Sequence, residues 1–331
     1  MKPILAFLWL SLLLLSGSPA LAWDATGHRL SAYVAWDLMT PASRASATRL
    51  LQEHPRYVQD FLGQMPDFIR DSDSAEQQRW LFGQAAVWPD LARGFSASAQ
   101  QRYHRPDWHW IDGRWVRGSA ERQGNVYVNT TPLPVIHGPA TANIRQESQA
   151  DNVVTALEYS LHRLEDGAIP ASDRAVALAW MLHLLGDLHQ PLHTGALVSG
   201  ERFPEGDRGG NAINVRGAGN LHSVWDRALR HLPFMNTLDE LSEQARQIRL
   251  EDRSLAETEI ETWLEESRQL LHSHVYTTGL RSAVAAAEGD RGRLPALALD
   301  EEYEQAMEQV SRERIALSGL RIAAALNRMN L

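Results

Sequence analysis

The sequence contains no cysteine among its 331 residues. This absence excludes disulfide bonds and thiolate metal sites, so a stable fold must rely on core packing, on metal bound by other ligands, or on both. A basic surplus is also missing, because 41 acidic residues outnumber 32 basic ones and the formal net charge is −9. This balance argues against sequence-independent binding along a nucleic acid duplex through a basic face. If the partner is a nucleic acid, bound cations must supply the local positive charge.

Long hydrophobic runs are scarce too. The clearest one, over residues 4–15, is too short to cross a bilayer comfortably. It follows Lys2 and leads to Ala20, Leu21 and Ala22, which is the layout of a secretory signal with an A-x-A cleavage site. We therefore expect residues 1–22 to be a signal peptide, export to the periplasm or beyond the cell, and no membrane span after cleavage. The alternative is a retained membrane anchor, which leaves Trp23 inside the chain.

Strand signals are few, and the regular parts of the chain have helical periodicity. No linker or change of composition divides residues 23–331, which we expect to form a single domain. We expect an all-α fold of packed, mostly long helices, with irregular loops forming a metal-lined cleft. Helices are expected over residues 27–39, 148–164, 172–188, 238–248, 256–274 and 300–329. Ser172 and Asp173 are expected to cap the third of these.

Two long stretches, residues 88–134 and 198–219, are expected to be irregular because they are rich in Gly, Pro, Asn and aromatic residues. Long loops in a compact domain are often functional. A short strand is expected over residues 127–135.

Residues 180–193, WMLHLLGDLHQPLH, concentrate the side chains that bind metals. His183 and Asp187 are four residues apart and project from one helical face. Pro191 tends to end the helix, which lets His193 turn back toward the same place. His222 and Asp226 repeat the four-residue spacing.

A single His-x-x-x-Asp pair is more often the polar face of a surface helix than a metal site. Here His183 lies in an apolar segment, where an imidazole beside a carboxylate is costly to bury unpaired. Two such pairs together with His193 therefore favour a metal site. Imidazole and carboxylate ligands without thiolate suit zinc.

Further motifs stand in a fixed order along the chain. They are Trp23 with His28 five residues later, Trp88-Pro89-Asp90, His109-Trp110-Ile111-Asp112, residues 190–193 (QPLH), Gly209-Gly210-Asn211, and finally His222 with Asp226. In this order and local spacing, the chain resembles the zinc-dependent single-strand nucleases of the S-one/P-one type and the related bacterial zinc phospholipases C. The resemblance covers nearly all of residues 23–331. Pro89 departs from the small residue that the family has at that position.

The resemblance implies three zinc ions per chain. One would be bound by Asp90, His109, His183 and Asp187. A second would be bound by the backbone amine and carbonyl of Trp23, by His28 and by Asp187, which would bridge the pair. The third would be bound by His193, His222 and Asp226. We treat His189 as structural, and the seven histidines at positions 54, 104, 137, 162, 231, 272 and 274 as surface or core residues.

The resemblance also implies an activity. It is the hydrolysis of single-stranded DNA, RNA and 3′-nucleotides to 5′-phosphorylated products by a hydroxide generated at zinc. Asp90 and Asp187 would act through the metals, and Arg93 could stabilise phosphoryl charge. Trp110 would stack on a base, Asp112 would bind the base edge, and Asn211 would approach the substrate. No stable protein partner is implied.

Two other functions remain open from the residues. A zinc phospholipase C would use the same ligands but would not need Trp110. A non-catalytic helical protein would use zinc only to stabilise a cysteine-free fold, and its metal sites would be closed by protein ligands.

Overall fold

The computed structural model describes residues 23–112, 124–130, 144–252, 254, 259–289, 294–329 and 331. The expected signal peptide and part of the first irregular stretch lie outside these residues. The described chain is an all-α fold, as the sequence predicts. Its α-helices are α1 (Ala25–Leu38), α2 (Pro41–Gln52), α3 (Asp67–Arg70), α4 (Ser74–Leu91), α5 (Ala97–Tyr103), α6 (Val153–Glu165), α7 (Ala171–Leu188), α8 (Leu221–Asp226), α9 (Phe234–Glu251), α10 (Ile260–Leu270), α11 (Thr278–Ala286) and α12 (Glu301–Arg328).

Short 3₁₀ and π turns join or extend these helices. They are η1 (Tyr57–Phe61), η2 (Leu62–Gln64), η3 (Ala92–Gly94), η4 (Pro106–His109), η5 (Glu147–Gln149), η6 (Pro191–His193) and η8 (Leu271–Val275). No described helix is both long enough and apolar enough to cross a membrane.

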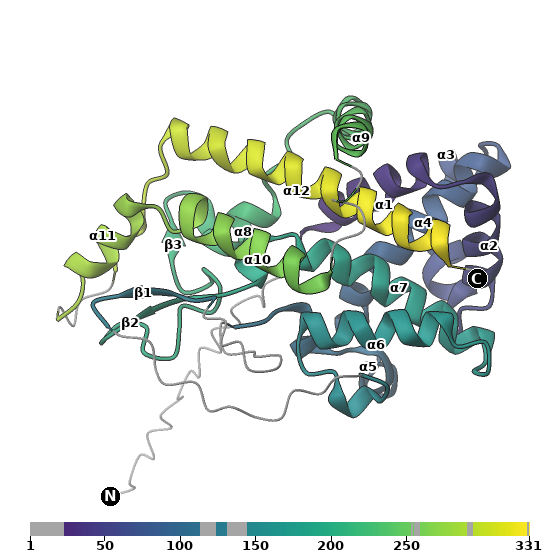
Figure 1. Ribbon diagram of the computed structural model, residues 1–331, viewed down its shortest axis with the longest axis horizontal. Coiled ribbons are helices and arrows are strands. Elements are labelled where there is room, and N and C mark those ends of the chain that lie inside the picture. Colours follow the sequence, from purple (N-terminus) through teal and green to yellow (C-terminus); the bar gives the residue numbers. More distant parts are fainter. Residues whose placement is uncertain are drawn as a thin grey trace, which may run out of the picture.

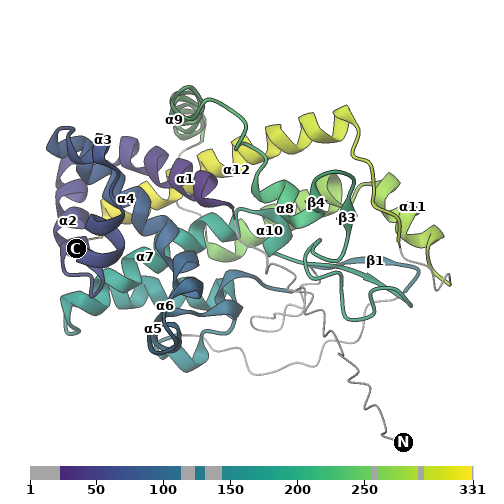
Figure 2. The same cartoon turned by 180° about the vertical axis from the view of Figure 1, so that it is seen from behind.

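Helix α7 is the central element of the larger half of the molecule. It packs against α1, α2, α4, α6 and α12, and Figures 1 and 2 show it from opposite sides beneath α1 and α12. From Ala177 to Leu188 its side chains are buried all round, including Leu178, Leu182 and Leu185. A helix that is apolar on every face is stable only inside a core. This central position brings ligand-bearing segments from several other elements within reach of α7.

Two hydrophobic clusters make up the interior. The larger one contains α7 as far as Leu188, and the smaller one contains Leu192 of η6 together with residues of α8, η8 and α11. The helix α7 ends between them. Pro191 cannot donate a backbone hydrogen bond, so the chain bends into η6 instead of continuing the helix. The QPLH motif therefore lies where the two clusters meet.

The strands are short. β1 (Val126–Val128) pairs in parallel with β2 (Leu197–Ser199), and β3 (Asn214–Val215) pairs antiparallel with β4 (Gly219–Asn220). β1 overlaps the first part of the strand that is expected over residues 127–135. Residues 131–135 lie outside the described residues. The expected irregularity of residues 198–219 is interrupted by the end of β2, by β3 and by the start of β4 at Gly219.

Two local expectations are wrong. Helix α4 continues through Pro89 to Leu91 and α5 occupies Ala97–Tyr103, so the stretch expected to be irregular begins too early and contains a helix. Pro89 lies in the last turn, where its missing N–H removes a single helical hydrogen bond, and the helix tolerates that loss at its end. The second is the cap of α7, because Pro170 occupies the N-cap and no side chain caps the helix there.

Candidate metal centre

His183 and Asp187 are both buried on the same face of α7, as their spacing predicts. Nε2 of His183 lies 3.3 Å from Oδ2 of Asp187. The other ring nitrogen, Nδ1, lies 2.8 Å from the carbonyl oxygen of Ala86 in α4 and donates to it. This bond fixes the orientation of the ring and directs Nε2 toward Asp187, an arrangement typical of metal-binding histidines.

His109 reaches the same place from η4. Its Nδ1 lies 3.1 Å from Oδ2 of Asp187 and 2.9 Å from Nε2 of His183. Asp90, at the end of α4, lies with Oδ1 3.9 Å from Nε2 of His183. Side chains from η4, α4 and α7 thus place atoms that can bind a metal close to Oδ2 of Asp187.

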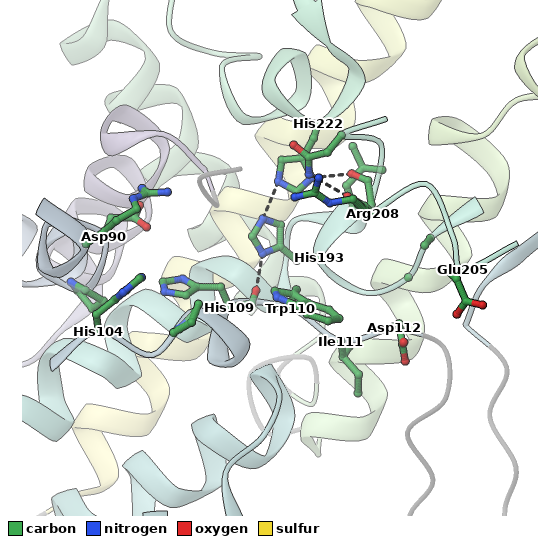
Figure 3. A pocket seen from close by; sticks show the side chains of 18 residues that line it. Asp90, His104, His109, Trp110, Ile111, Asp112, His193, Glu205, Arg208 and His222 are labelled. Atoms are coloured by element: carbon green, nitrogen blue, oxygen red, sulfur yellow. Dashed lines mark hydrogen bonds between the residues drawn. The ribbon is translucent and has the colours of Figure 1, made fainter. Parts of the chain in front are cut away.

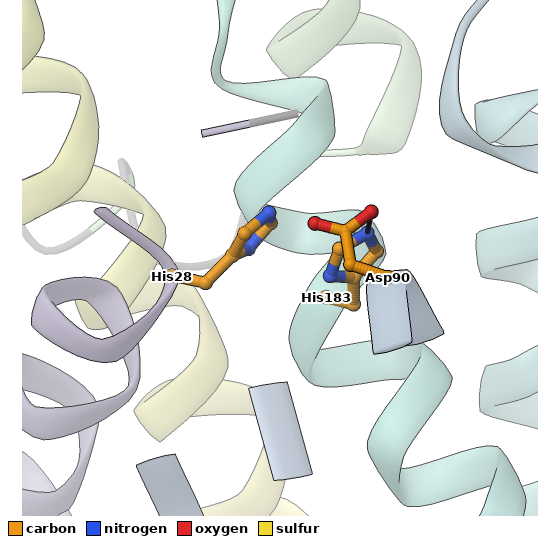
Figure 4. A group of neighbouring side chains, drawn as sticks. All are labelled: His28, Asp90 and His183. Atoms are coloured by element: carbon orange, nitrogen blue, oxygen red, sulfur yellow. Dashed lines mark ion pairs between the residues drawn. The ribbon is translucent and has the colours of Figure 1, made fainter. Parts of the chain in front are cut away.

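His28 and Trp23 join this cluster from the start of α1. Nε2 of His28 lies 3.4 Å from Oδ1 of Asp187, and its ring stacks on that of His183 with 4.0 Å between centroids. Figure 4 shows His28 from α1 facing His183 from α7, with Asp90 beside them. The indole of Trp23 is buried, and its Cβ lies against Gly27. Gly186 leaves room for His28, because a Cβ there would lie 2.7 Å from Nδ1 of His28.

The side-chain donors fall into groups that overlap. His109, His183 and Asp187 form one trio within 4.8 Å, and His28, Asp90 and His183 form another. The second trio contains ligands from both of the zinc sets that the resemblance implies. These side chains therefore make one continuous cluster.

A third trio lies on the other side of His109. Nε2 of His193 lies 3.1 Å from Nε2 of His222, which lies 3.5 Å from Oδ2 of Asp226. Nδ1 of His222 donates to the carbonyl oxygen of Gly209 at 2.6 Å, and Nδ1 of His193 donates to the carbonyl oxygen of His109. As with His183, these backbone contacts leave Nε2 of each ring directed at its partner ligands.

The donor geometry fits zinc. A zinc ion at about 2.0–2.2 Å from tetrahedral ligands holds them about 3.3 Å apart, and the His–Asp distances of 3.1, 3.3, 3.4 and 3.5 Å are close to that value. Both ring nitrogens of His28 and Oδ1 of Asp187 are buried without a hydrogen-bond partner among the described residues. Buried polar atoms in this state are costly unless something else binds them. A metal ion bound by Nε2 of His28 and Oδ1 of Asp187, which lie 3.4 Å apart, would offset that cost at these two atoms.

The electrostatics of the cluster also favour a bound cation. Burial lowers the pKa of His28 well below its usual range, and the neighbouring His183 lowers it further, so His28 is neutral. Burial also lowers the pKa of His193. Although burial opposes its charged form, Asp187 and Asp90 raise the pKa of His183 to about 9. Burial raises the pKa of Asp226 well above its usual range. Burial opposes the charged form of Asp187 too, but the neighbouring His183 and His109 lower its pKa well below its usual range. Asp187 therefore stays a carboxylate through positive charge nearby, and a bound metal ion would supply that charge with the histidines neutral.

A pocket of 460 Å³ opens in front of these ligands. Asp90, His109, His193 and His222 form part of its wall, as Figure 3 shows. Four residues expected to contact the substrate also line it, namely Arg93, Trp110, Asp112 and Asn211. Trp110 is 47% exposed, which is unusual for so large an apolar side chain. Its exposure inside the pocket makes it available for stacking. The structure thus brings the metal-ligand side chains and the expected substrate residues to one cleft.

Three ionisable residues of this pocket were not assigned to the site from the sequence. His104, treated there as a surface or core residue, lines the pocket, as do Glu205 and Arg208. No motif marks them, and only their placement in the fold reveals them. His189, by contrast, points away from the metal ligands, with Nδ1 donating to the carbonyl oxygen of Leu185 and Nε2 2.7 Å from the buried guanidinium of Arg321. Its surroundings fit the expected structural role.

Comparisons with known proteins agree with the geometry. Residues 23–330 match the family described as S1/P1 Nuclease. Endonuclease 1 of Arabidopsis thaliana is 25% identical over 332 residues, covering 96% of this chain and 90% of that protein. Endonuclease 4 of the same plant is 32% identical over 46% of this chain and 50% of its own length. Nuclease P1 of Penicillium citrinum is 26% identical over 45% of this chain and 52% of its own length.

Proposed function

The chain belongs to the S1/P1 nuclease family, and from that premise we propose that it is an exported nuclease with three zinc ions per chain. Its substrates are single-stranded DNA, RNA and 3′-nucleotides. Hydrolysis breaks the bond between phosphorus and O3′, so the oxygen of water joins the phosphate and O3′ leaves with a proton. Cleavage within a strand therefore gives a 5′-phosphate on one product and a free 3′-hydroxyl on the other, and a 3′-nucleotide gives a nucleoside and inorganic phosphate.

The convergence of buried histidines and aspartates on one open cleft carries this proposal. A purely structural zinc site is closed by protein ligands, whereas a catalytic site faces substrate. Here Asp90, His109, His193 and His222 line the pocket directly. The same pocket contains Trp110, whose side chain is 47% exposed.

The ligand sets follow the implied pattern. Asp90, His109, His183 and Asp187 would bind one zinc ion, and His193, His222 and Asp226 another. The backbone of Trp23, with His28 and Asp187, would bind the remaining ion. Bound zinc supplies a Lewis acid for the phosphoryl oxygens and water that is activated near neutral pH.

The chain's own residues bind and orient the substrate. Trp110 stacks on a nucleobase, which tolerates any base and suits a flexible single strand. Asp112, two residues further on, accepts hydrogen bonds from the base edge. Arg93, beside Asp90 in the pocket, pairs with phosphoryl oxygens through its planar guanidinium.

We further propose that residues 1–22 are removed as a signal peptide, leaving residues 23–331 as a single domain in the periplasm or outside the cell. The family match starts at Trp23, which agrees with cleavage at that position. Only cleavage there gives Trp23 a free amine. The backbone next to it is fixed, since the N–H of Asp24 donates to the carbonyl oxygen of Asp226 at 3.1 Å.

The test is a zinc count on protein that begins at Trp23, combined with four hydrolysis assays. Single-stranded DNA, RNA, a 3′-nucleotide and phosphatidylcholine are assayed before and after chelation, and again after zinc is restored. We expect about three zinc ions per chain and nucleotide cleavage that chelation abolishes. Cleavage of phosphatidylcholine alone would assign the site to the phospholipases C. Zinc-loaded protein inactive on all four substrates would support a structural role for the metal.

A further inference from the structure

Arg208 has a backbone conformation that its side chain does not favour. Its φ is +61°, and Gly209 and Gly210 continue the left-handed region with φ of +56° and +82°. Glycine adopts such values freely, whereas arginine in this region is strained by its Cβ. Strain of this kind is retained where the surrounding structure enforces it, and it gathers at functional sites.

Hydrogen bonds hold the turn from both sides. Nδ2 of Asn211 donates to the carbonyl oxygen of Arg208 at 2.8 Å. On the other side, the buried carboxylate of Asp207 accepts from the N–H of Leu197 at 2.9 Å and from the hydroxyl of Tyr276 at 2.7 Å. Asp207 also donates its own N–H to the carbonyl oxygen of Leu197 at 2.9 Å. The backbone of Arg208 is therefore held in this conformation by hydrogen bonds of Asp207 and Asn211.

The same turn is tied to the third metal-ligand trio. The carbonyl oxygen of Gly209 accepts from Nδ1 of His222 at 2.6 Å. A Cβ at position 209 would lie 2.5 Å from the carbonyl oxygen of Leu192, so the backbone passes closely over η6. The position of Arg208 relative to the metal ligands is consequently set by the backbone.

The guanidinium of Arg208 is a free positive charge at the edge of the pocket. Its side chain is exposed and lines the pocket, and no carboxylate of the described residues forms an ion pair with it. Figure 3 shows it beside His222, on the side away from Asp90 and His104. Because Arg93 lies near Asp90, Arg208 is the arginine that lines the pocket beside His222.

We propose that the Arg208 turn is a phosphate subsite for the nucleotide next to the one being cleaved. This inference rests on the proposed function, because it needs a polynucleotide in the cleft. Consecutive phosphates of a single strand extend beyond the reach of one metal cluster, and an exposed guanidinium on a fixed backbone is suited to bind a phosphate with two parallel hydrogen bonds. The chain uses a strained arginine here so that its charge is held at this end of the cleft.

The test compares substrates that differ only in flanking phosphates. A dinucleoside monophosphate has the scissile phosphate alone, and two derivatives carry an added 5′-phosphate or a methyl-blocked 3′-phosphate. For the wild-type chain, we expect one of the added phosphates to lower KM about tenfold, the effect of a hydrogen bond to a charged group. Arg208→Gly should abolish that gain and change kcat/KM for the unmodified dinucleotide less than about twofold.

Arg208→Gly is compared with two further variants, which separate the effect of losing the charge from an effect on folding. Arg208→Gly removes the charge and relieves the backbone strain, so loss of the gain cannot come from misfolding. Arg208→Lys keeps a charge without the planar fork and should restore part of the gain. The matched control is Arg216→Gly, since Arg216 is an exposed arginine in the β3–β4 hairpin outside the pocket. With a longer single strand, Arg208→Gly should also make the salt dependence of log kcat/KM shallower by about 0.7.

The outcomes are distinct. If Arg208→Gly keeps the wild-type gain for both added phosphates, the subsite does not exist. If it slows all substrates equally, including a 3′-nucleotide, Arg208 acts on the metal ligands and the inference is also wrong. Failure of the wild-type protein to cleave any nucleotide would instead overturn the proposed function.

Discussion

Nε2 of His28 lies 3.4 Å from Oδ1 of Asp187, so the first turn of α1 meets the last turn of α7 inside the core. His28 follows Trp23 by five residues, and both side chains are buried. Trp23 and His28 therefore lie beside Asp187, and if the proposed cleavage frees the amine of Trp23, the state of that amine should decide whether the ligand set is complete.

The first prediction concerns the residue before Trp23. An additional alanine ahead of Trp23 replaces the free amine with an amide nitrogen, which is a poor metal ligand. We expect the zinc content to fall by one ion per chain and hydrolysis of single-stranded DNA to fall at least about hundredfold, more than the loss of an outer hydrogen bond typically costs. Elemental analysis and a nuclease assay check this, with protein that begins at Trp23 as the control. Full zinc content in the extended protein would remove Trp23 from the ligand set.

The second prediction compares two buried carboxylates. Asp187 lies within 3.4 Å of three histidines, whereas among the described histidines only His222 is paired with Asp226 at so short a distance, 3.5 Å. We expect Asp187→Asn to lose two zinc ions and Asp226→Asn to lose one, because an amide cannot replace a shared carboxylate. Both substitutions are buried, so each serves as the folding control for the other. Equal metal loss in the two variants would contradict a bridging role for Asp187.

Local spacing was sufficient to predict that two metal-ligand side chains on the same helix lie close together. His183 and Asp187 share a face because α7 is continuous, and Pro191 ends that helix as its chemistry requires. The expected long helices near both ends of the chain agree with α1, α9 and α12 in position, within a few residues. Periodicity reports such elements well because their burial is regular.

Tertiary placement could not be predicted in the same way. Helix α4 was not among the expected helices, and its last turn was taken as irregular, since a proline inside a helix gives the same local signal as a proline that ends one. The parallel pairing of β1 with β2 joins segments about 70 residues apart, and three-residue strands carry almost no pattern. The turn at Arg208, with its positive φ, is held in part by hydrogen bonds of the preceding Asp207 with Leu197 and Tyr276, which no local spacing reveals.

The third prediction concerns Trp110. Its ring is 47% exposed in the pocket, so its removal should cost substrate stacking and little folding free energy. Stacking on an aromatic contributes about 1–3 kcal/mol per base, so Trp110→Ala should lower kcat/KM for single-stranded DNA by roughly 5- to 150-fold. Met235→Ala is the control, because Met235 is 52% exposed outside the pocket. Unchanged kinetics in Trp110→Ala would show that Trp110 does not stack on a base.

The fourth prediction concerns pH. Burial raises the pKa of Asp207 from 3.8 to about 6, despite the hydrogen bond from Tyr276. The folded state therefore binds more protons than the unfolded state between these two values, and stability falls as pH rises through them. The stabilisation is complete below pH 3.8 and is lost above about pH 6. Asparagine does not titrate, so the stability of Asp207→Asn relative to wild type should rise by about 3 kcal/mol over this window.

Urea denaturation of both proteins between pH 4 and pH 7 measures that difference. The difference between the proteins cancels the titration of groups that they share, including the metal ligands. A difference in unfolding free energy that does not change with pH would mean that Asp207 has an ordinary pKa in the folded state.

The fifth prediction tests the space that Gly186 leaves for His28. Alanine is favoured over glycine inside a helix by about 1 kcal/mol, so Gly186→Ala should stabilise α7 if packing did not matter. However, the added Cβ would lie 2.7 Å from Nδ1 of His28, whose ring is also stacked on His183. His28 cannot move away without leaving Asp187. We therefore expect a net loss of about 1–3 kcal/mol in unfolding free energy, together with weaker zinc binding.

Gly279→Ala is the matched control, because Gly279 lies in α11 and an added Cβ there meets nothing within 4 Å. It should leave zinc affinity unchanged and stability equal or slightly higher. Competition with a chelator measures zinc affinity, and thermal or urea unfolding in chelator measures the packing effect alone. If Gly186→Ala loses zinc affinity but not metal-free stability, the Cβ displaces His28 only from its ligand position. If it loses neither, the contact between Gly186 and His28 does not constrain the site.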